Sequence, residues 1–160
     1  MTRLLTNLAL LLTLVLPVSV FANTAADDID IINPNARATP PGTSNSAIFL
    51  VLNNKSNHAH HLTSVKTSIA KSTELHTHIK SDGMMKMVPV KQIQLPAQSE
   101  VRLKSGGGHI MLIGLNAGLK PGQTLELELT FEDGSQKSLT VPIRKIGSSK
   151  KMQHDHKHKM

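Results

Sequence analysis

The feature that most constrains the fold of this sequence is an alternation of apolar and polar residues with a period of two. In residues 125–131 every second side chain is Leu or Phe and the others are Glu or Thr, and residues 139–143 repeat the pattern. Because successive side chains of a strand point to opposite faces, both segments are predicted to be strands with one buried face. Asp133 and Gly134 between them predict a hairpin with a type I′ turn, whose two central residues have positive φ.

The rest of the chain shows the same pattern in shorter stretches. Residues 29–31 alternate Ile with Asp, residues 34–42 contain three prolines and a glycine, and the apolar residues 47–52 precede a polar turn. Helical periodicity is hard to find. We therefore predict an all-β fold, an antiparallel β-sandwich or barrel, in one domain that spans residues 23–147.

The N-terminal segment differs in composition from this domain. Arg3 precedes an apolar run at residues 8–20, and small residues follow where a signal peptidase would cleave, after about Ala22. An uncleaved anchor would need about 18 or more apolar residues. The sequence has no cysteine for lipid attachment. We therefore expect residues 1–22 to be a signal peptide and the mature protein to be exported, soluble and not membrane-anchored.

The composition excludes several classes of function. Without cysteine, the chain has no disulfide, no thiolate metal site and no thiol nucleophile. It contains no Trp or Tyr and only three Phe, so it has little material for stacking on bases, and nucleic acid is not an expected partner. The formal net charge of +7 comes partly from lysines near the C-terminus and indicates no particular partner.

Histidine and methionine are concentrated in the middle of the chain. Alternation in residues 107–113 places His109 and Met111 on one face of a predicted strand, with Ile110 and Leu112 on the other face. The glycines before His109 allow another backbone or a ligand to approach closely. Met111 taken alone would be interpreted as a core residue, whereas the pair suggests two ligands that converge from one strand.

A second group of donors lies in a predicted hairpin. His76 and His78 precede a turn at residues 81–83, after which Met87 returns toward them. A two-residue loop pairs Met87 with His78, whereas pairing with His76 requires the register to shift by two, so either histidine is admissible. The two other methionines of this segment, which lie nearer the turn, are expected to be packing or loop residues: Met84 and Met85.

These donor types indicate copper(I). Thioether sulfur and imidazole are neutral and comparatively soft ligands that suit Cu(I), while Zn²⁺ normally takes thiolate, imidazole or carboxylate. A blue-copper electron-transfer site would need a cysteine thiolate, which this chain lacks.

The spacing of these residues resembles the signature of the periplasmic copper chaperone family called PCuAC. That signature is His, ten residues, Met, twenty-one residues, His, one residue and Met, and it is matched at every interval by His76, Met87, His109 and Met111. The resemblance covers roughly residues 28–146, and it includes neighbouring segments at residues 36–42, 82–87 and 107–114.

This resemblance implies a cupredoxin-like fold and a single copper(I) site. The four matching residues would hold Cu(I) in a shallow, exposed site, which favours His76 over His78 as the ligand. The protein would be a periplasmic metallochaperone, not an enzyme, that delivers Cu(I) to the dinuclear copper centre of cytochrome c oxidase subunit II, alongside other copper assembly factors. The alternative is a copper buffer without a dedicated acceptor. The chain departs from the family in having Thr77 where many members have methionine and Gly108 where an aromatic residue is common.

Two further groups of histidines require an interpretation. Residues 148–160 lack apolar periodicity and are predicted to be a disordered tail. The tail would suit Cu(II) as a secondary site or would serve as a charged, solubilising extension; its donors are Met152, His154, His156, His158 and Met160. The other group is expected to be solvated loop histidines, with a metal patch as the alternative: His58, His60 and His61.

Overall fold

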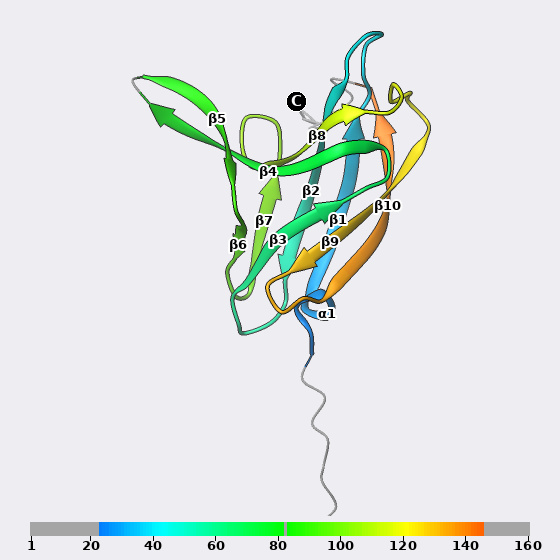
Figure 1. Ribbon diagram of the computed structural model, residues 1–160. Coiled ribbons are helices and arrows are strands. Elements are labelled where there is room, and N and C mark those ends of the chain that lie inside the picture. The colour runs from blue at the N-terminus through cyan, green and yellow to red at the C-terminus, as the bar shows by residue number, and fades with distance from the viewer. Residues whose placement is uncertain (1–22, 82, 146–160) are drawn as a thin grey trace, which may run out of the picture.

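The computed structural model describes residues 23–81 and 83–145, and most of them form strands (Figure 1). The predicted signal peptide and C-terminal tail lie outside these residues. No helix in the described part of the chain has the length and apolarity that a membrane crossing requires. The elements are α1 (Ala25–Asp28), β1 (Ile29–Arg37), β2 (Asn45–Asn54), β3 (His60–Lys66), β4 (Ala70–Ser81), β5 (Met84–Val90), β6 (Ile93–Leu95), β7 (Ser99–Leu103), β8 (His109–Leu115), β9 (Thr124–Phe131) and β10 (Gln136–Arg144).

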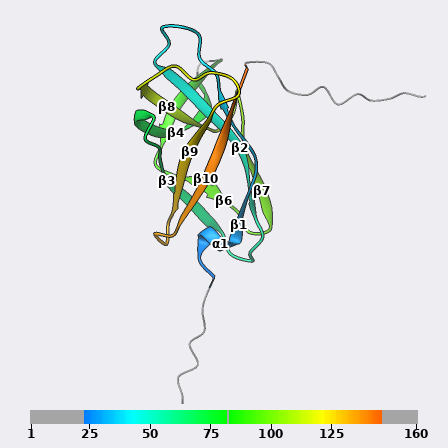
Figure 2. The same cartoon turned by 90° about the vertical axis from the view of Figure 1, so that its right-hand side faces the viewer.

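The predicted all-β, cupredoxin-like fold is confirmed. The strands follow the order β5-β4-β8-β2-β1-β10-β9-β3-β6, and β7 pairs separately with β2. Neighbours in this order are antiparallel except β1 and β10, which run parallel where Ala36 lies opposite Ile143. The sequence predicted antiparallel pairing alone, because alternation shows which face of a strand is buried but not the direction of its neighbour. The first and last strands, β1 and β10, thus lie side by side, and Figure 1 and Figure 2 show them from two directions 90° apart.

The hydrophobic core joins inward-facing residues of both halves of this strand order. In β8, Ile110 and Leu112 are fully buried in it, and in β4 Leu75 joins them. Each such side chain contributes roughly 1.5–3 kcal/mol when it leaves water. Because alternation is strict, burial of these residues directs their neighbours to the outer face of the sheet. The other large residues fully buried in this core are Phe131, Ile29, Ile48, Leu50, Leu52, Leu62, Leu95, Leu127, Leu129 and Val141.

The hairpin between β9 and β10 is confirmed, but its predicted turn type is wrong. Gly134 has a φ of 80°, whereas Asp133 is not among the described residues with positive φ. Phe131 N–H donates to the Ser135 carbonyl at 3.0 Å, and Gly134 N–H donates to the Phe131 carbonyl at 3.0 Å. This is a longer loop closed by a glycine bulge. Asp133 uses its carboxylate instead, accepting from the backbone N–H groups of Ser135 at 2.9 Å and Ala25 at 2.8 Å.

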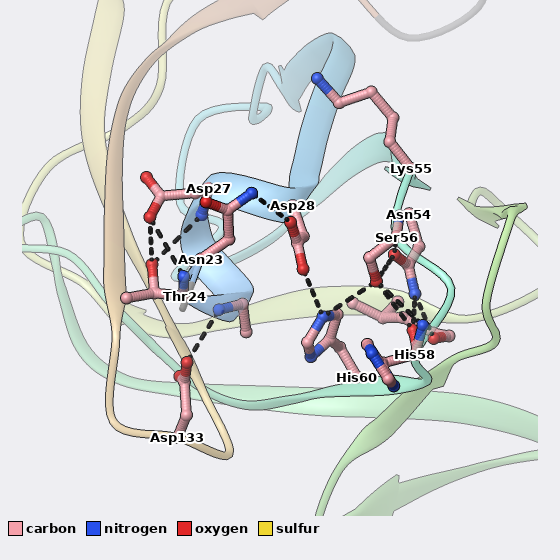
Figure 3. A network of polar contacts seen from close by, with 12 residues as sticks. Asn23, Thr24, Asp27, Asp28, Asn54, Lys55, Ser56, His58, His60 and Asp133 are labelled. Atoms are coloured by element: carbon pink, nitrogen blue, oxygen red, sulfur yellow. Dashed lines mark hydrogen bonds and ion pairs between the residues drawn. The ribbon is translucent and has the colours of Figure 1, made fainter. Parts of the chain in front are cut away.

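At the α1 end of the molecule, His60 joins three distant parts of the chain. Its Nδ1 donates to Glu132 Oε1 at 2.8 Å. Its Nε2 donates to Asp28 Oδ2 at 3.1 Å, as Figure 3 shows. The His60 side chain is only 12% exposed and lies in β3, so the expectation of a solvated loop histidine is wrong for this residue. Burial disfavours its charged form, but the bonds to Glu132 and Asp28 outweigh this effect, and the pKa of His60 is raised.

We expect this raised pKa to make the stability of the protein depend on pH. The protonated form of His60 is favoured in the folded state, so its contribution is fully present below pH 6.5 and is lost as the pH rises through the raised pKa. The variant His60→Gln should therefore reduce the free energy of unfolding more at pH 6 than at pH 9. Urea unfolding of both proteins at the two pH values measures this difference, and an equal loss at both would contradict the assignment.

Candidate metal site

The predicted ligands of β8 lie on the outer face of the sheet, between β2 and β4. Met111 pairs with Ala47 of β2 on one side and with Glu74 of β4 on the other, while His109 pairs with His76 of β4. The ring centroids of His109 and His76 are 5.7 Å apart. Met111 is half-buried and is not a member of the core cluster. The interpretation of His109 and Met111 as a pair on one face agrees with this geometry.

The register between β4 and β5 answers the question that the sequence left open. His78 lies directly opposite Met87, whereas His76 lies opposite Pro89. No shift of register occurs along this pair of strands, and Met87 is therefore the direct neighbour of His78 and the diagonal neighbour of His76. His76, His78 and Met87 share the face that carries His109. His76 lies directly opposite His109 and Met87 directly opposite His78, and residues two apart on one strand, such as His76 and His78, also lie on one face.

A pocket of about 390 Å³ opens on this face. Its wall includes Met87, His109 and Met111 of the predicted set, together with His78 and the ring of Phe49. The Phe49 ring centroid lies 6.4 Å from that of His109 and forms an apolar side of the pocket. The fourth predicted ligand, His76, is not part of the lining, although its ring centroid lies 5.7 Å from that of His109. The structure thus brings three predicted ligands and one additional histidine around a single space.

One backbone carbonyl orients two of the imidazoles. Gly107 O accepts from His109 Nδ1 at 2.9 Å and from His78 Nδ1 at 3.0 Å. Since a carbonyl can only accept, both rings carry their proton on Nδ1 and leave Nε2 as the lone-pair nitrogen. The loop that presents this carbonyl bends at Gly106, which has a φ of 77° that other residues rarely adopt.

His76 is oriented in the opposite sense. Its Nε2 lies 2.7 Å from Glu74 Oε2, so the carboxylate accepts the proton of that nitrogen. Its Nδ1 is buried and has no hydrogen-bond partner among the described residues. A buried polar atom without a partner costs free energy unless a ligand satisfies it. A metal ion would do so, and a carboxylate behind a metal-binding histidine is the usual way of fixing its tautomer. These residues therefore fit a metal ion.

The thioethers are essential to this site. No group of three or more His, Cys, Asp or Glu side chains within residues 23–81 and 83–145 is placed to hold a metal ion. A metal ion held at this site would therefore need methionine sulfur in addition to the imidazoles. This composition favours a soft, monovalent ion such as Cu(I).

The exposed methionines of the hairpin differ from their expected roles. Met84 and Met85 belong to β5 and are each 61% exposed, so they are neither packed nor in a loop. Thr77 pairs with Val88 and faces the opposite side of β4 from His76. The methionine that many relatives have at this position would therefore point away from the pocket.

Sequence reasoning did not identify Glu74 or the Gly107 carbonyl as parts of the site. Glu74 had a detectable signal, because it stands two residues before His76 and so shares its face on a strand. The Gly107 carbonyl had none, because a loop's path determines where its carbonyl points. His78 was recognised as a candidate but was set aside in favour of His76.

The sequence of this chain matches one family model and is similar to a curated relative. A family model described as "LpqE-like: Putative lipoprotein LpqE-like" matches residues 29–143. The putative lipoprotein Lxx21020 of Leifsonia xyli subsp. xyli (strain CTCB07) is 39% identical over 79 residues, which make up 49% of this chain. That match spans about half of the relative, 48% of its length.

Solved structures share the fold. The copper-bound PCuAC domain from PmoF2 has a TM-score of 0.65 and 22% identity, over 77% of this chain and 97% of that domain. The solution structure of CuI-DR1885 from Deinococcus radiodurans has a TM-score of 0.57 and 30% identity, over 74% of this chain and 81% of its own.

We expect the carboxylate of Glu74 to strengthen metal binding through His76. The variant Glu74→Ala should weaken Cu(I) binding by about tenfold, the lower end of the effect that such outer partners have. Competition with a chromogenic Cu(I) chelator measures the affinity. Glu100→Ala is the matched control, because Glu100 is also exposed and also bonds a side chain two residues away, Arg102, on β7. Equal affinities of the two variants would contradict the role of Glu74.

Proposed function

Because the chain belongs to the LpqE-like family, which is the PCuAC-like family, we propose that it is a copper(I) metallochaperone and not an enzyme. The observation that carries this proposal is the convergence of His109, Met111 and Met87 around one pocket. The neighbouring ring of His76 has a buried Nδ1 without a hydrogen-bond partner among the residues that the structure describes. Two structural neighbours, a copper-bound PCuAC domain and CuI-DR1885, support copper as the ion.

The ligand set proposed for Cu(I) is His76, Met87, His109 and Met111. Nδ1 of His76, Nε2 of His109 and two thioether sulfurs are all neutral, so the ion keeps its charge and no proton must leave when it binds. Met87 is 48% exposed and His109 only 3%, so the set extends from the surface to the base of the pocket. An acceptor would displace the exposed thioether first and the buried imidazole last. The ion then passes by ligand exchange without release into solvent.

The acceptor and compartment extend the same proposal. We place the protein in the periplasm, exported by residues 1–22, and propose the dinuclear copper centre of cytochrome c oxidase subunit II as the acceptor. A copper buffer without a dedicated acceptor would use the same ligands, and a transfer experiment separates the two functions. A secondary Cu(II) site at Met152–Met160 remains part of the proposal, although these residues lie outside those that the structure describes.

We expect the loss of one thioether ligand to weaken Cu(I) binding without unfolding the protein. Met111→Ala should lower the affinity by at least about tenfold, because losing a ligand costs no less than losing an outer partner of a ligand. Met84→Ala removes an exposed thioether from the other face of the hairpin and should leave the affinity unchanged. Chelator competition measures both affinities, with circular dichroism to verify the fold. An unchanged affinity of Met111→Ala would exclude this residue from the site.

Delivery has its own test. The Cu(I)-loaded protein is mixed with the apo copper domain of the oxidase subunit, and the absorption of the acceptor is followed with the acceptor first reduced and then oxidised. Delivery requires the acceptor to gain copper in at least one of these states. If the acceptor gains none in either state while the protein still binds Cu(I), the buffer function stands instead.

A further inference from the structure

The hairpin of β4 and β5 carries soft donors beyond the proposed ligand set, and they lie in a row on one face. The pairs Lys80–Met85 and His78–Met87 follow one another along the two strands. Since these positions differ by two residues, their side chains share a face and successive pairs are about 7 Å apart. The row therefore leads from the outer part of the hairpin to the pocket. In Figure 1 the hairpin projects to one side of the molecule, beyond the strands that cover the core.

We propose that this face of the hairpin is the path by which Cu(I) enters and leaves the site, with Met85 as its outer donor and His78 as its inner one. The proposal rests on the proposed function, since it concerns movement of the same ion. It assigns a role to Met85 and His78, which lie outside the His-Met signature. The ion that they would bind is a soft monovalent cation.

The solvent exposure of the side chains falls from the outer end of the row to the pocket. Met85 is 61% exposed and Met87 48% exposed, while His109 at the base of the pocket is 3% exposed. An ion that meets the protein from solvent therefore encounters Met85 and Met87 before it encounters His109. Methionine has three rotatable bonds and a polarisable sulfur, so neighbouring thioethers can hold one ion jointly during a step.

His78 is suited to be the inner donor of this path. Its Nδ1–H is held by the Gly107 carbonyl, which leaves Nε2 as the lone-pair nitrogen. It lines the pocket together with Met87, and its ring centroid lies 5.6 Å from that of His109. The ring therefore stands between the exposed thioether and the buried imidazole, where an ion can bind before it reaches the final set.

Each step on this path exchanges one neutral donor for another. A new Cu–S or Cu–N bond forms as an older Cu–S bond breaks, copper remains in the +1 state, and no proton is transferred. Because a path residue affects loading and release equally, its loss slows both rates and leaves their ratio, the affinity, nearly unchanged.

The hairpin itself provides a matched pair of variants. Met84 and Met85 are adjacent, each is 61% exposed, and the register places them on opposite faces, with Met84 opposite Ser81. We expect Met85→Ala to slow Cu(I) transfer to a chromogenic chelator by about fivefold to tenfold in stopped-flow measurements, with an affinity within about twofold of the unsubstituted protein. Met84→Ala should transfer at the rate of the unsubstituted protein. His78→Ala should slow transfer by a similar factor.

The outcomes separate this proposal from the proposed function. If the unsubstituted protein does not bind Cu(I), the proposed function fails. If it binds Cu(I) but Met85→Ala transfers at an unchanged rate, or if Met84→Ala slows transfer equally, the path is wrong and the site remains. Titration with Ag(I) gives a second readout, in which the methyl signal of Met85, but not that of Met84, should shift in NMR spectra. Shifts confined to Met87 and Met111 would also overturn the path.

Discussion

The rest of the site depends on the burial of Ile110 and Leu112 in the core. These two side chains of β8 are completely buried, and their positions leave only the outer face for His109 and Met111. A slip of one residue would expose both aliphatic side chains, at roughly 1.5–3 kcal/mol each, and would turn an imidazole and a thioether into the core. The donors are therefore held in register by residues that never touch the metal. The proposed Cu(I) site and the stability of the fold therefore depend on this same strand.

The local parts of this arrangement could be predicted from the sequence, because period-two alternation is a property of neighbouring residues. The strands at residues 125–131 and 139–143 and the shared face of His109 and Met111 are of this kind. The pairing of β4 with β8, in contrast, joins segments that are distant along the chain. It places His76 opposite His109, and the residues of neither segment specify this pairing. The four proposed ligands were thus recognisable as a set only by their resemblance to a family.

Predictions from the sequence failed where a side chain forms specific hydrogen bonds. Asp133 does not have the positive φ that a type I′ turn requires, and its carboxylate accepts hydrogen bonds from two backbone N–H groups. His60 resembled a loop histidine because its partners, Asp28 and Glu132, are 32 and 72 residues away along the chain. Burial patterns reflect the periodicity of the chain, whereas such bonds depend on where distant segments meet. For the same reason, the sequence left His76 and His78 both admissible, and the family resemblance favoured His76 without showing that both rings lie beside that of His109.

The acceptor that orients His78 and His109 is a main-chain atom, and this has an evolutionary consequence. No codon change can delete the carbonyl of Gly107, so substitution at this position acts only through the shape of the loop. Insertions and deletions between β7 and β8, by contrast, would move the carbonyl away from both rings at once. The orientation of the two imidazoles therefore depends on the length of this loop and not on the identity of a side chain. Selection on copper handling should preserve the length of this loop more strictly than its composition.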